Sequence, residues 1–487
     1  MKKTTALSLL LASCLSTTTM DTGDPNGSTD GGGPATGSMP PLQASEILGR
    51  PTTRSIAVSM VPAEPLEAYI EVGTAPGVYS IQTTPAVYSA GTPFVISVDG
   101  LSANTGYVYR VRWRRPGSAD FLAATEHSFH TQRAVGSTFR FTLQADSHLD
   151  ENSVLEMYRR TLGNVLADAP DFHIDLGDTF MCEKHTQPFD AVVMAAPNQA
   201  VTDTRYLYER GHFGLFAHSS PLFLVNGNHE GELGYLSLGT GQDIATWATL
   251  ARKKFYLNPT PDGFYGGDSM TEPLVGQRAA WYSWQWGDAL FVALDPFWQT
   301  KTKSSTDGWA WTLGDRQFKW LEQTLTASTA KFKFVFLHNL VGGLDGQMRG
   351  GVEAAPFFEW GGKNADGTTG FGGKRPGWSK PMHQLLIDNK VTAVFHGHDH
   401  LYAKQDLDGI VYQEVPQPSA KNTNNAAMLA SAYHYTSGTI LASAGHLRVT
   451  VTPDKVTSEY VRAWLPTNET ATRKNAQIDD TWVALPK

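Results

Sequence analysis

Cysteine is almost absent from this sequence, which has only Cys14 and Cys182 among its 487 residues. Cys14 lies in a segment with the features of a targeting signal, so no internal disulfide is expected to hold the fold. Basic residues are also too few and too scattered to form a nucleic-acid platform: 39 Lys and Arg face 47 Asp and Glu, and no long basic run occurs. A nucleotide substrate is not excluded by this composition.

Long hydrophobic runs are missing as well. No stretch in the body of the chain is uninterrupted for the length that a membrane helix needs, and the apolar run at residues 6–12 is too short. That run follows Lys2 and Lys3 and ends just before Cys14, an arrangement that resembles a bacterial lipoprotein signal with an acylated Cys. A plain secretory signal is the alternative. We expect a protein of the bacterial cell envelope, in the periplasm or at the cell surface, anchored only through lipid on Cys14.

The rest of the composition predicts two folded domains behind this signal, which we place at residues 1–13. Residues 14–41 are rich in Ser, Thr, Gly, Pro and Asp and are expected to be a disordered tether. Residues 42–133 contain short alternating strands separated by turn residues, which predicts a β-sandwich. Residues 134–487 alternate hydrophobic strands with helical stripes, which predicts an α/β domain.

Six strands and three helices are the clearest elements of the α/β domain. We expect one helix that begins with a capping box formed by Ser153 and Glu156. A second helix is expected through Phe318 and Leu325, and a third at residues 382–389. The expected strands are residues 139–144, 172–176, 222–225, 290–294, 332–337 and 392–395.

Polar residues with metal-binding side chains follow five of these strands. Open α/β sheets place ligand groups at the carboxyl ends of their strands, so we expect these side chains to converge. Carboxylate, amide and imidazole groups together suit divalent first-row metals, and two ions about 3.5–4 Å apart hold both the attacking and the leaving oxygen in hydrolysis. Each motif alone is weak evidence for a metal site, whereas the occurrence of all five in this order is specific evidence for one. The residues are Asp146, His148, Asp178, Asn228, His229, His338, His398 and His400.

This order of motifs resembles the calcineurin-like metallophosphoesterase family, in its purple-acid-phosphatase-like form, from residue 139 to about residue 464. The resemblance implies two facing mixed β-sheets flanked by helices, with the site at one edge. It also implies that a fibronectin-type III-like domain precedes the catalytic domain, and residues 100–110 resemble the corner of such a domain in which a Tyr closes a turn.

Ligand roles follow from the same resemblance, for two divalent or mixed-valence ions of Fe, Mn or Zn. Asp178 is similar to the carboxylate that bridges the two ions, and His229 to a histidine that binds no metal and sits beside the leaving-group oxygen. The first metal would be held by Asp146, His148 and His400, and the second by Asn228, His338 and His398.

Several neighbours of these residues depart from the family pattern or carry weaker expectations. Met181 stands where purple acid phosphatases have a metal-binding Tyr, which speaks against a tightly bound ferric first metal. Cys182 is expected to be a small buried thiol, with an approach to the metals as the alternative. His396 is expected to support the site from behind. Rim loops are expected at residues 191–218 and 342–379. Four cationic side chains in the second loop are expected to be solvated surface charges, with steering of an anionic substrate as the alternative: Arg349, Lys363, Lys374 and Arg375.

These observations together predict a hydrolase of phosphate mono- or diesters. Two cations neutralise phosphate charge and lower the pKa of bound water, so no Ser or Cys nucleophile is needed. The sequence has no phosphate-binding Gly-x-x-x-x-Gly-Lys loop and no nucleophile elbow at the matching sites. The alternatives are a cell-surface binding module on a retired phosphoesterase scaffold, and another dinuclear hydrolase chemistry on the same fold.

The signal predicts a lipid-modified amino terminus. We expect the mature protein to begin at Cys14 with acyl chains attached, and Cys14→Ala to release or stall the protein, because the attachment atom is then missing. Mass spectrometry of the mature amino terminus checks this. An unmodified terminus at another residue would contradict the expectation.

Overall fold

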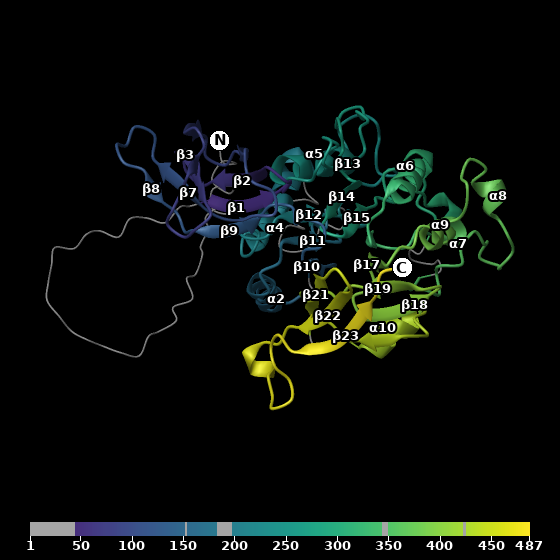
Figure 1. Cartoon of the computed structure of the whole chain (residues 1–487). Coiled ribbons are helices and arrows are strands. Elements are labelled where there is room, and N and C mark those ends of the chain that lie inside the picture. The colour runs from purple at the N-terminus through teal and green to yellow at the C-terminus, as the bar shows by residue number, and fades with distance from the viewer. Residues whose placement is uncertain (1–43, 151–152, 183–196, 343–348, 422–424) are drawn as a thin grey trace.

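The computed structural model describes residues 44–150, 153–182, 197–342, 349–421 and 425–487, which form an all-β part followed by an α/β part (Figure 1). The expected signal and the whole of the expected tether, with Cys14, lie outside these residues. None of the helices in the described segments is long and apolar enough to cross a bilayer.

The all-β part consists of two sheets. A three-stranded sheet has the order β1-β2-β6, and the second sheet has the order β4-β3-β7-β8, with β5 paired to β3 and β9 to β7. The strands are β1 (Ala44–Gly49), β2 (Ile56–Pro62), β3 (Leu66–Gly73), β4 (Ile81–Gln82), β5 (Ala86–Tyr88), β6 (Phe94–Val98), β7 (Gly106–Arg114), β8 (Leu122–Ala123) and β9 (His127–His130).

Alternation of apolar and polar residues explains this part. Tyr107, Tyr109, Val111 and Trp113 on β7 are buried in the core between the two sheets, and the residues between them are partly exposed. The hydroxyl of Tyr107 accepts a hydrogen bond from the backbone N–H of Ser102 (2.8 Å), so a tyrosine closes this turn. The expected β-sandwich is confirmed.

The α/β part is built on two mixed sheets. A six-stranded sheet has the order β12-β11-β10-β21-β22-β23, and an eight-stranded sheet has the order β13-β14-β15-β16-β17-β19-β18-β20. Strands β10, β11 and β12 are parallel, as are β15, β16, β17 and β19. The first sheet contains β10 (Phe139–Gln144), β11 (Phe172–Asp175), β12 (Leu222–Leu224), β21 (Gly445–Val451), β22 (Val456–Arg462) and β23 (Ile478–Ala484). The second contains β13 (Gly266–Gly267), β14 (Tyr282–Trp286), β15 (Ala289–Ala293), β16 (Phe332–Phe336), β17 (Ala393–His396), β18 (Tyr402–Leu407), β19 (Ile410–Glu414) and β20 (Thr439–Leu441).

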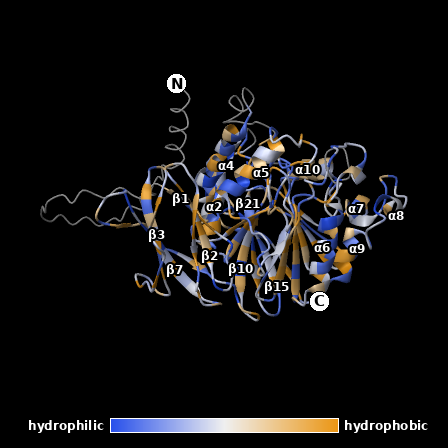
Figure 2. Cartoon of the chain, turned by 90° about the horizontal axis from the view of Figure 1, so that it is seen from above, coloured by the Kyte–Doolittle hydropathy of each residue, from blue (hydrophilic) through white to orange (hydrophobic). Residues whose placement is uncertain are grey.

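An aromatic core joins these two sheets. Phe141 and Phe172 from the first sheet each meet Phe291 of the second edge to face, with ring centroids 5.1 Å apart. Such pairs contribute about 0.5–1.5 kcal/mol each beyond the burial of their area. Hydrophobic residues concentrate on the central strands, such as β10 and β15, and colours mix on the outlying helices (Figure 2). The expected facing sheets are confirmed, and their rigid packing holds the strand ends of both sheets in register.

Helices flank the sheets, and one of them begins differently from the expectation. The amino end of α2 is capped by Val154 without a side-chain hydrogen bond. Ser153 instead donates its hydroxyl to the carbonyl of Ser147 (3.2 Å), so the capping box with Glu156 is wrong. The helices are α2 (Leu155–Ala167), α4 (Gln199–Phe213), α5 (Ile244–Phe255), α6 (Gly314–Ala327), α7 (Phe358–Gly361), α8 (Phe371–Lys374), α9 (Met382–Asp388) and α10 (Ala426–Tyr433), with 3-10 turns at Gly308–Ala310 and Pro466–Asn468.

Helix α4 joins the all-β part to the α/β part. Its Arg210 is fully buried and donates to the carbonyl of Ser59 on β2 (2.5 Å), and Ile47 of β1 packs in one apolar cluster with Phe213. The backbone N–H of Leu48 also donates to the carbonyl of Ala217 (2.9 Å). The two parts therefore share a core and do not pack only through a polar surface.

Candidate metal site

The predicted ligand residues meet where strands of both sheets end. Asp146 and His148 follow β10, Asp178 follows β11, Asn228 and His229 follow β12, His338 follows β16, and His398 and His400 follow β17. The structure gathers six of them in two sets, and within each set the ligand atoms lie within 4.8 Å of one another. We call Asp146, His148 and His400 the first ligand group, and Asp178, His338 and His398 the second ligand group.

The Asp178 carboxylate lies between the two groups. Its Oδ2 is 3.1 Å from Nε2 of His338 in the second group and 3.7 Å from Nε2 of His148 in the first. The groups also approach each other directly, since Oδ1 of Asp146 is 3.8 Å from Nε2 of His338. One carboxylate therefore faces an imidazole from each sheet, as a bridging ligand must.

Buried atoms without partners show that these residues fit metal ions. Among the described residues, five buried side-chain atoms at this place have no hydrogen-bond partner: Asp146 Oδ1, His148 Nε2, Asn228 Oδ1, His338 Nε2 and His398 Nε2. Leaving such groups unpaired in a protein interior costs roughly 1–3 kcal/mol each. All five are oxygen or imidazole nitrogen ligands of the kind that first-row divalent metals take. Ions at this place would satisfy all of them at once.

Hydrogen bonds behind the imidazoles fix which nitrogen faces the centre. Nδ1 of His338 lies 2.9 Å from the carbonyl of Leu176 and donates to it, which turns Nε2 toward the centre. Nδ1 of His148 is likewise 3.2 Å from Oδ2 of Asp150. Both rings are thus oriented for ligation before any ion binds.

The charges of the groups are mutually dependent. Burial disfavours charge on every one of them, yet the carboxylates of Asp178 and Asp146 raise the pKa of His338 to about 9. Burial likewise opposes ionisation of Asp178, but His338 and His229 hold its pKa well below its usual range. Burial lowers the pKa of His398 well below the usual value, which keeps that ring in its neutral, ligating form.

The loops that carry the ligands adopt strained backbone conformations. Five ligand residues have positive φ in the left-handed region, where side chains other than glycine are disfavoured. Conformations of this kind cost on the order of 1–3 kcal/mol each and persist only where surrounding contacts enforce them. The five residues are Asp146 (62°), His148 (53°), Asp178 (54°), His398 (85°) and His400 (58°).

Glu230 is one of the contacts that enforce this backbone, and sequence reasoning assigned it no role. Its buried carboxylate accepts hydrogen bonds from the backbone N–H groups of Asp178 (2.9 Å), Thr179 (2.7 Å), Phe180 (3.2 Å) and Gly227. The Asp178 loop and the Asn228 loop are therefore tied to one carboxylate. Glu230 directly follows Asn228 and His229 in the sequence, and this position could have indicated a role at the site.

Access to the site is from the side of His229 and His400. Their side chains are 16% and 29% exposed, whereas those of Asp146 and His338 are completely buried. The backbone N–H of His229 donates to Oδ1 of Asp178 (2.7 Å), and its Nε2 lies 3.9 Å from Oδ2 of the same carboxylate. His229 thus stands at the mouth of the site beside the ligand groups and belongs to neither of them.

Nearby residues from the sequence analysis have structural roles. Cys182 is buried in the apolar cluster between α4 and α5, as expected for a small buried thiol, and Met181 is buried beside it. Nδ1 of His396 lies 2.7 Å from Oε2 of Glu414 behind the ligand loop, which agrees with its expected supporting position.

Two expectations about the rim are wrong, namely a loop at residues 199–213 and solvated side chains at Arg349 and Arg375, while residues 191–196 and 343–348 lie outside the described residues. Much of residues 191–218 is helix α4, whose Tyr206 is fully buried and donates to the carbonyl of Glu230 (3.1 Å). In residues 342–379, Arg349 is nearly buried against Asp399, and Arg375 pairs with the buried carboxylate of Glu359. These two arginines are therefore not solvated rim charges. The polar and charged residues on the buried face of α4 and the Gly-rich surroundings of the arginines concealed this in the sequence.

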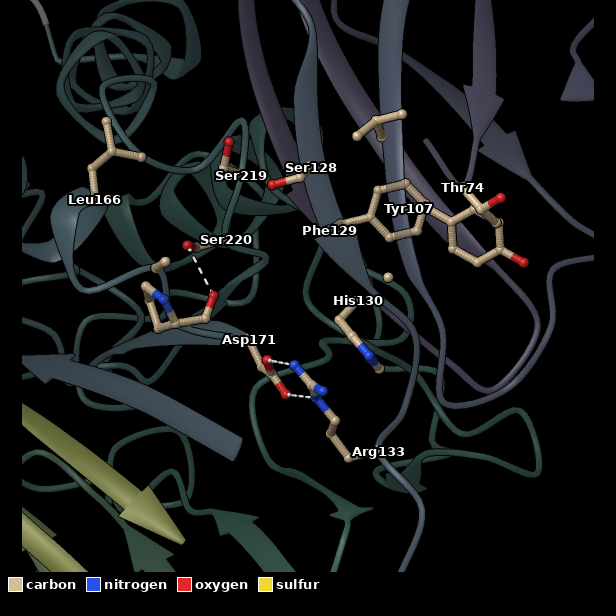
Figure 3. Close-up of a pocket in the computed structure, with 14 residues that line it drawn as sticks. Thr74, Tyr107, Ser128, Phe129, His130, Arg133, Leu166, Asp171, Ser219 and Ser220 are labelled. Atoms are coloured by element: carbon tan, nitrogen blue, oxygen red, sulfur yellow. Dashed lines mark hydrogen bonds and ion pairs between the residues drawn. The ribbon is translucent and has the colours of Figure 1, made fainter. Parts of the chain in front are cut away.

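A hollow away from the ligand groups lies at the junction of the all-β and α/β parts (Figure 3). It has a volume of about 540 Å³ and is lined by residues such as Tyr107, His130 and Leu166. Its one strong charge pair is internal, because Arg133 donates two hydrogen bonds to Asp171 (2.7 and 2.8 Å). None of its lining residues belongs to the ligand groups, so the site chemistry is not located there.

Comparison with known proteins supports the fold. No protein-family model and no curated protein matches the sequence. The structure of PhoD is similar with a TM-score of 0.62, covering 91% of this chain and 90% of that chain at 14% identity. The resemblance to the purple-acid-phosphatase-like metallophosphoesterases is confirmed at the level of the fold. The structure of GAP50, the anchor in the inner membrane complex of Plasmodium, aligns with a TM-score of only 0.36 at 12% identity, covering 72% of this chain and 89% of that chain.

The position of Asp178 predicts that metal binding at both ligand groups depends on it. We expect Asp178→Ala to lose the metal bound at both groups, because its carboxylate faces both of them. Metal analysis of purified protein checks this.

Asp171→Ala is the matched control, since Asp171 is a buried carboxylate that directly precedes β11, whereas Asp178 follows that strand. This control should lower thermal stability and retain both metals. Two retained metals in Asp178→Ala would show that the carboxylate does not bridge.

Proposed function

We propose that this protein is a metal-dependent phosphoesterase that hydrolyses phosphate mono- or diesters at a dinuclear centre. The observation that supports it best is the pair of ligand groups with the Asp178 carboxylate between them. Seven side chains would hold the ions: Asp146, His148 and His400 the first, Asn228, His338 and His398 the second, and Asp178 both. Bound ions neutralise the charge of a phosphate group and lower the pKa of a coordinated water to about 7.

Buried and exposed side chains of the site have different roles in the proposed reaction. The buried ligands hold a fixed charge arrangement that needs no reorganisation during the reaction. His400 and His229, at the open side, stand where an ester enters. We assign His229 to proton donation at the oxygen of the leaving group, because its ring lies beside the ligand groups and outside both.

A retired scaffold is the competing proposal, and loss of ligands would be its signature. All seven ligand positions carry metal-binding side chains, and six of them converge in the two groups. We therefore favour a working enzyme. Binding of a partner by the all-β part is compatible with it.

Metal removal tests the proposed activity. We expect protein treated with a chelator to hydrolyse no member of a panel of phosphate monoesters and diesters, and addition of Mn²⁺, Zn²⁺ or Fe²⁺ to restore turnover. The panel also decides between monoesters and diesters. Unchanged turnover after complete chelation, or no turnover with two bound metals, would contradict the proposal.

The role of His229 predicts a dependence on the leaving group. A positioned general acid contributes about 10²- to 10⁴-fold, and most when the departing alkoxide is a strong base. We expect His229→Ala to slow alkyl phosphate esters by this range and nitrophenyl esters far less, with both metals retained. Steady-state kinetics on the two ester classes measures the difference.

His383→Ala on α9 is the control for removal of a histidine outside the site, and it should leave both rates unchanged. Equal losses on the two ester classes, or loss of a metal, would exclude proton donation by His229.

A further inference from the structure

We propose that Arg349 is a positioning residue that sets both ligand groups at once by holding the loop between β17 and β18. This inference rests on the proposed dinuclear site and adds a residue to it. The loop carries His398 of the second ligand group and His400 of the first, with Asp399 between them. A displacement of this one loop therefore moves a ligand of each ion.

Arg349 contacts the loop at two points. Its guanidinium donates from both Nε (2.9 Å) and Nη2 to Oδ1 of Asp399, and Nη2 also lies 3.3 Å from the carbonyl of His398. The guanidinium stacks over the ring of Tyr433, with its carbon 3.7 Å from the ring centroid. The side chains of Arg349 and Asp399 are only 10% and 5% exposed, so solvent screens this pair little.

The other oxygen of Asp399 completes the anchor. Oδ2 accepts a hydrogen bond from the hydroxyl of Tyr435 (2.8 Å), and the backbone N–H of Asp399 donates to Oε1 of Glu414 on β19 (2.9 Å). Glu414 in turn holds Nδ1 of His396. The residue between the two ligands is thus fixed from three sides, and Arg349 is the cation among these contacts.

The strained backbone explains why an anchor is needed. His398 and His400 both have positive φ, at 85° and 58°. Without external contacts such residues relax toward ordinary conformations. The forked geometry of an arginine matches a carboxylate in a way that lysine does not reproduce. We therefore expect the arginine side chain itself to be required at this position.

Metal affinity is the direct readout, because it does not depend on turnover. The test is a calorimetric titration with Mn²⁺ and with Zn²⁺ of three proteins from which a chelator has removed the metal: the wild type, Arg349→Ala and Arg349→Lys. Loss of a residue that orients metal ligands typically weakens binding by about 10- to 100-fold, and we expect Arg349→Ala to weaken both sites within this range. Arg349→Lys should lie between Arg349→Ala and the wild type. At saturating metal, the KM for a phosphate ester should stay unchanged.

Arg375→Ala is the matched control. Arg375 also pairs with a buried carboxylate, that of Glu359, and lies near the rings of Trp309 and Trp378. Its contacts in the described parts of the chain include none with residues 397–400. We expect Arg375→Ala to lose stability and to keep both metal affinities.

Four outcomes would overturn the proposal. In Arg349→Ala, these are a raised KM with unchanged metal affinities, or weaker metal binding at one site only. The other two are equally weakened metal binding in Arg375→Ala, or wild-type metal affinities in Arg349→Lys when Arg349→Ala does not fold. The first would make Arg349 a substrate-binding cation. If the wild type hydrolyses no ester and both Arg349 variants still weaken both metals, the positioning role stands and the proposed activity is wrong.

Discussion

The Asp178 carboxylate is the constraint on which the rest of the structure depends. A buried anion is costly unless it is paired, and this one faces His338 from the eight-stranded sheet and His148 from the six-stranded sheet. The pairing is available only where the carboxyl ends of β10, β11, β16 and β17 meet. The aromatic core between the sheets fixes that meeting point, since close-packed interiors deform little. The fold therefore serves to hold one shared carboxylate between two sets of imidazoles.

Strain and buried charge at this point are balanced by supporting carboxylates. Glu230 gathers the backbone N–H groups of the Asp178 and Asn228 loops, and Asp399 anchors the loop of His398 and His400 through Arg349 and Tyr435. The loops of Asp178, Asn228 and His398 are thus held by acidic residues that bind no metal in our account and fix the backbone instead. Such support allows the left-handed conformations to persist and aims unpaired ligand atoms at one place.

Much of this architecture could be predicted from the sequence because it follows from local patterns. Strand β10 begins and ends where expected, and the ligands follow their strands in the expected order. The capping box at Ser153 failed because a tertiary contact with the carbonyl of Ser147 took its hydroxyl. Helix α4 was missed because its buried face includes polar and charged residues such as Arg205 and Glu209. Asp399, the partner of Arg349, is 50 residues away in the sequence, so no local pattern predicts the pair.

The central claim is that two ions share Asp178, and anomalous diffraction from crystals grown with Zn²⁺ or Mn²⁺ tests it most directly. The account predicts two anomalous peaks about 3.5–4 Å apart, the separation typical of two-metal hydrolases, one at each ligand group and both in contact with the Asp178 carboxylate. A single peak, or two peaks of which one has no contact with Asp178, would contradict it.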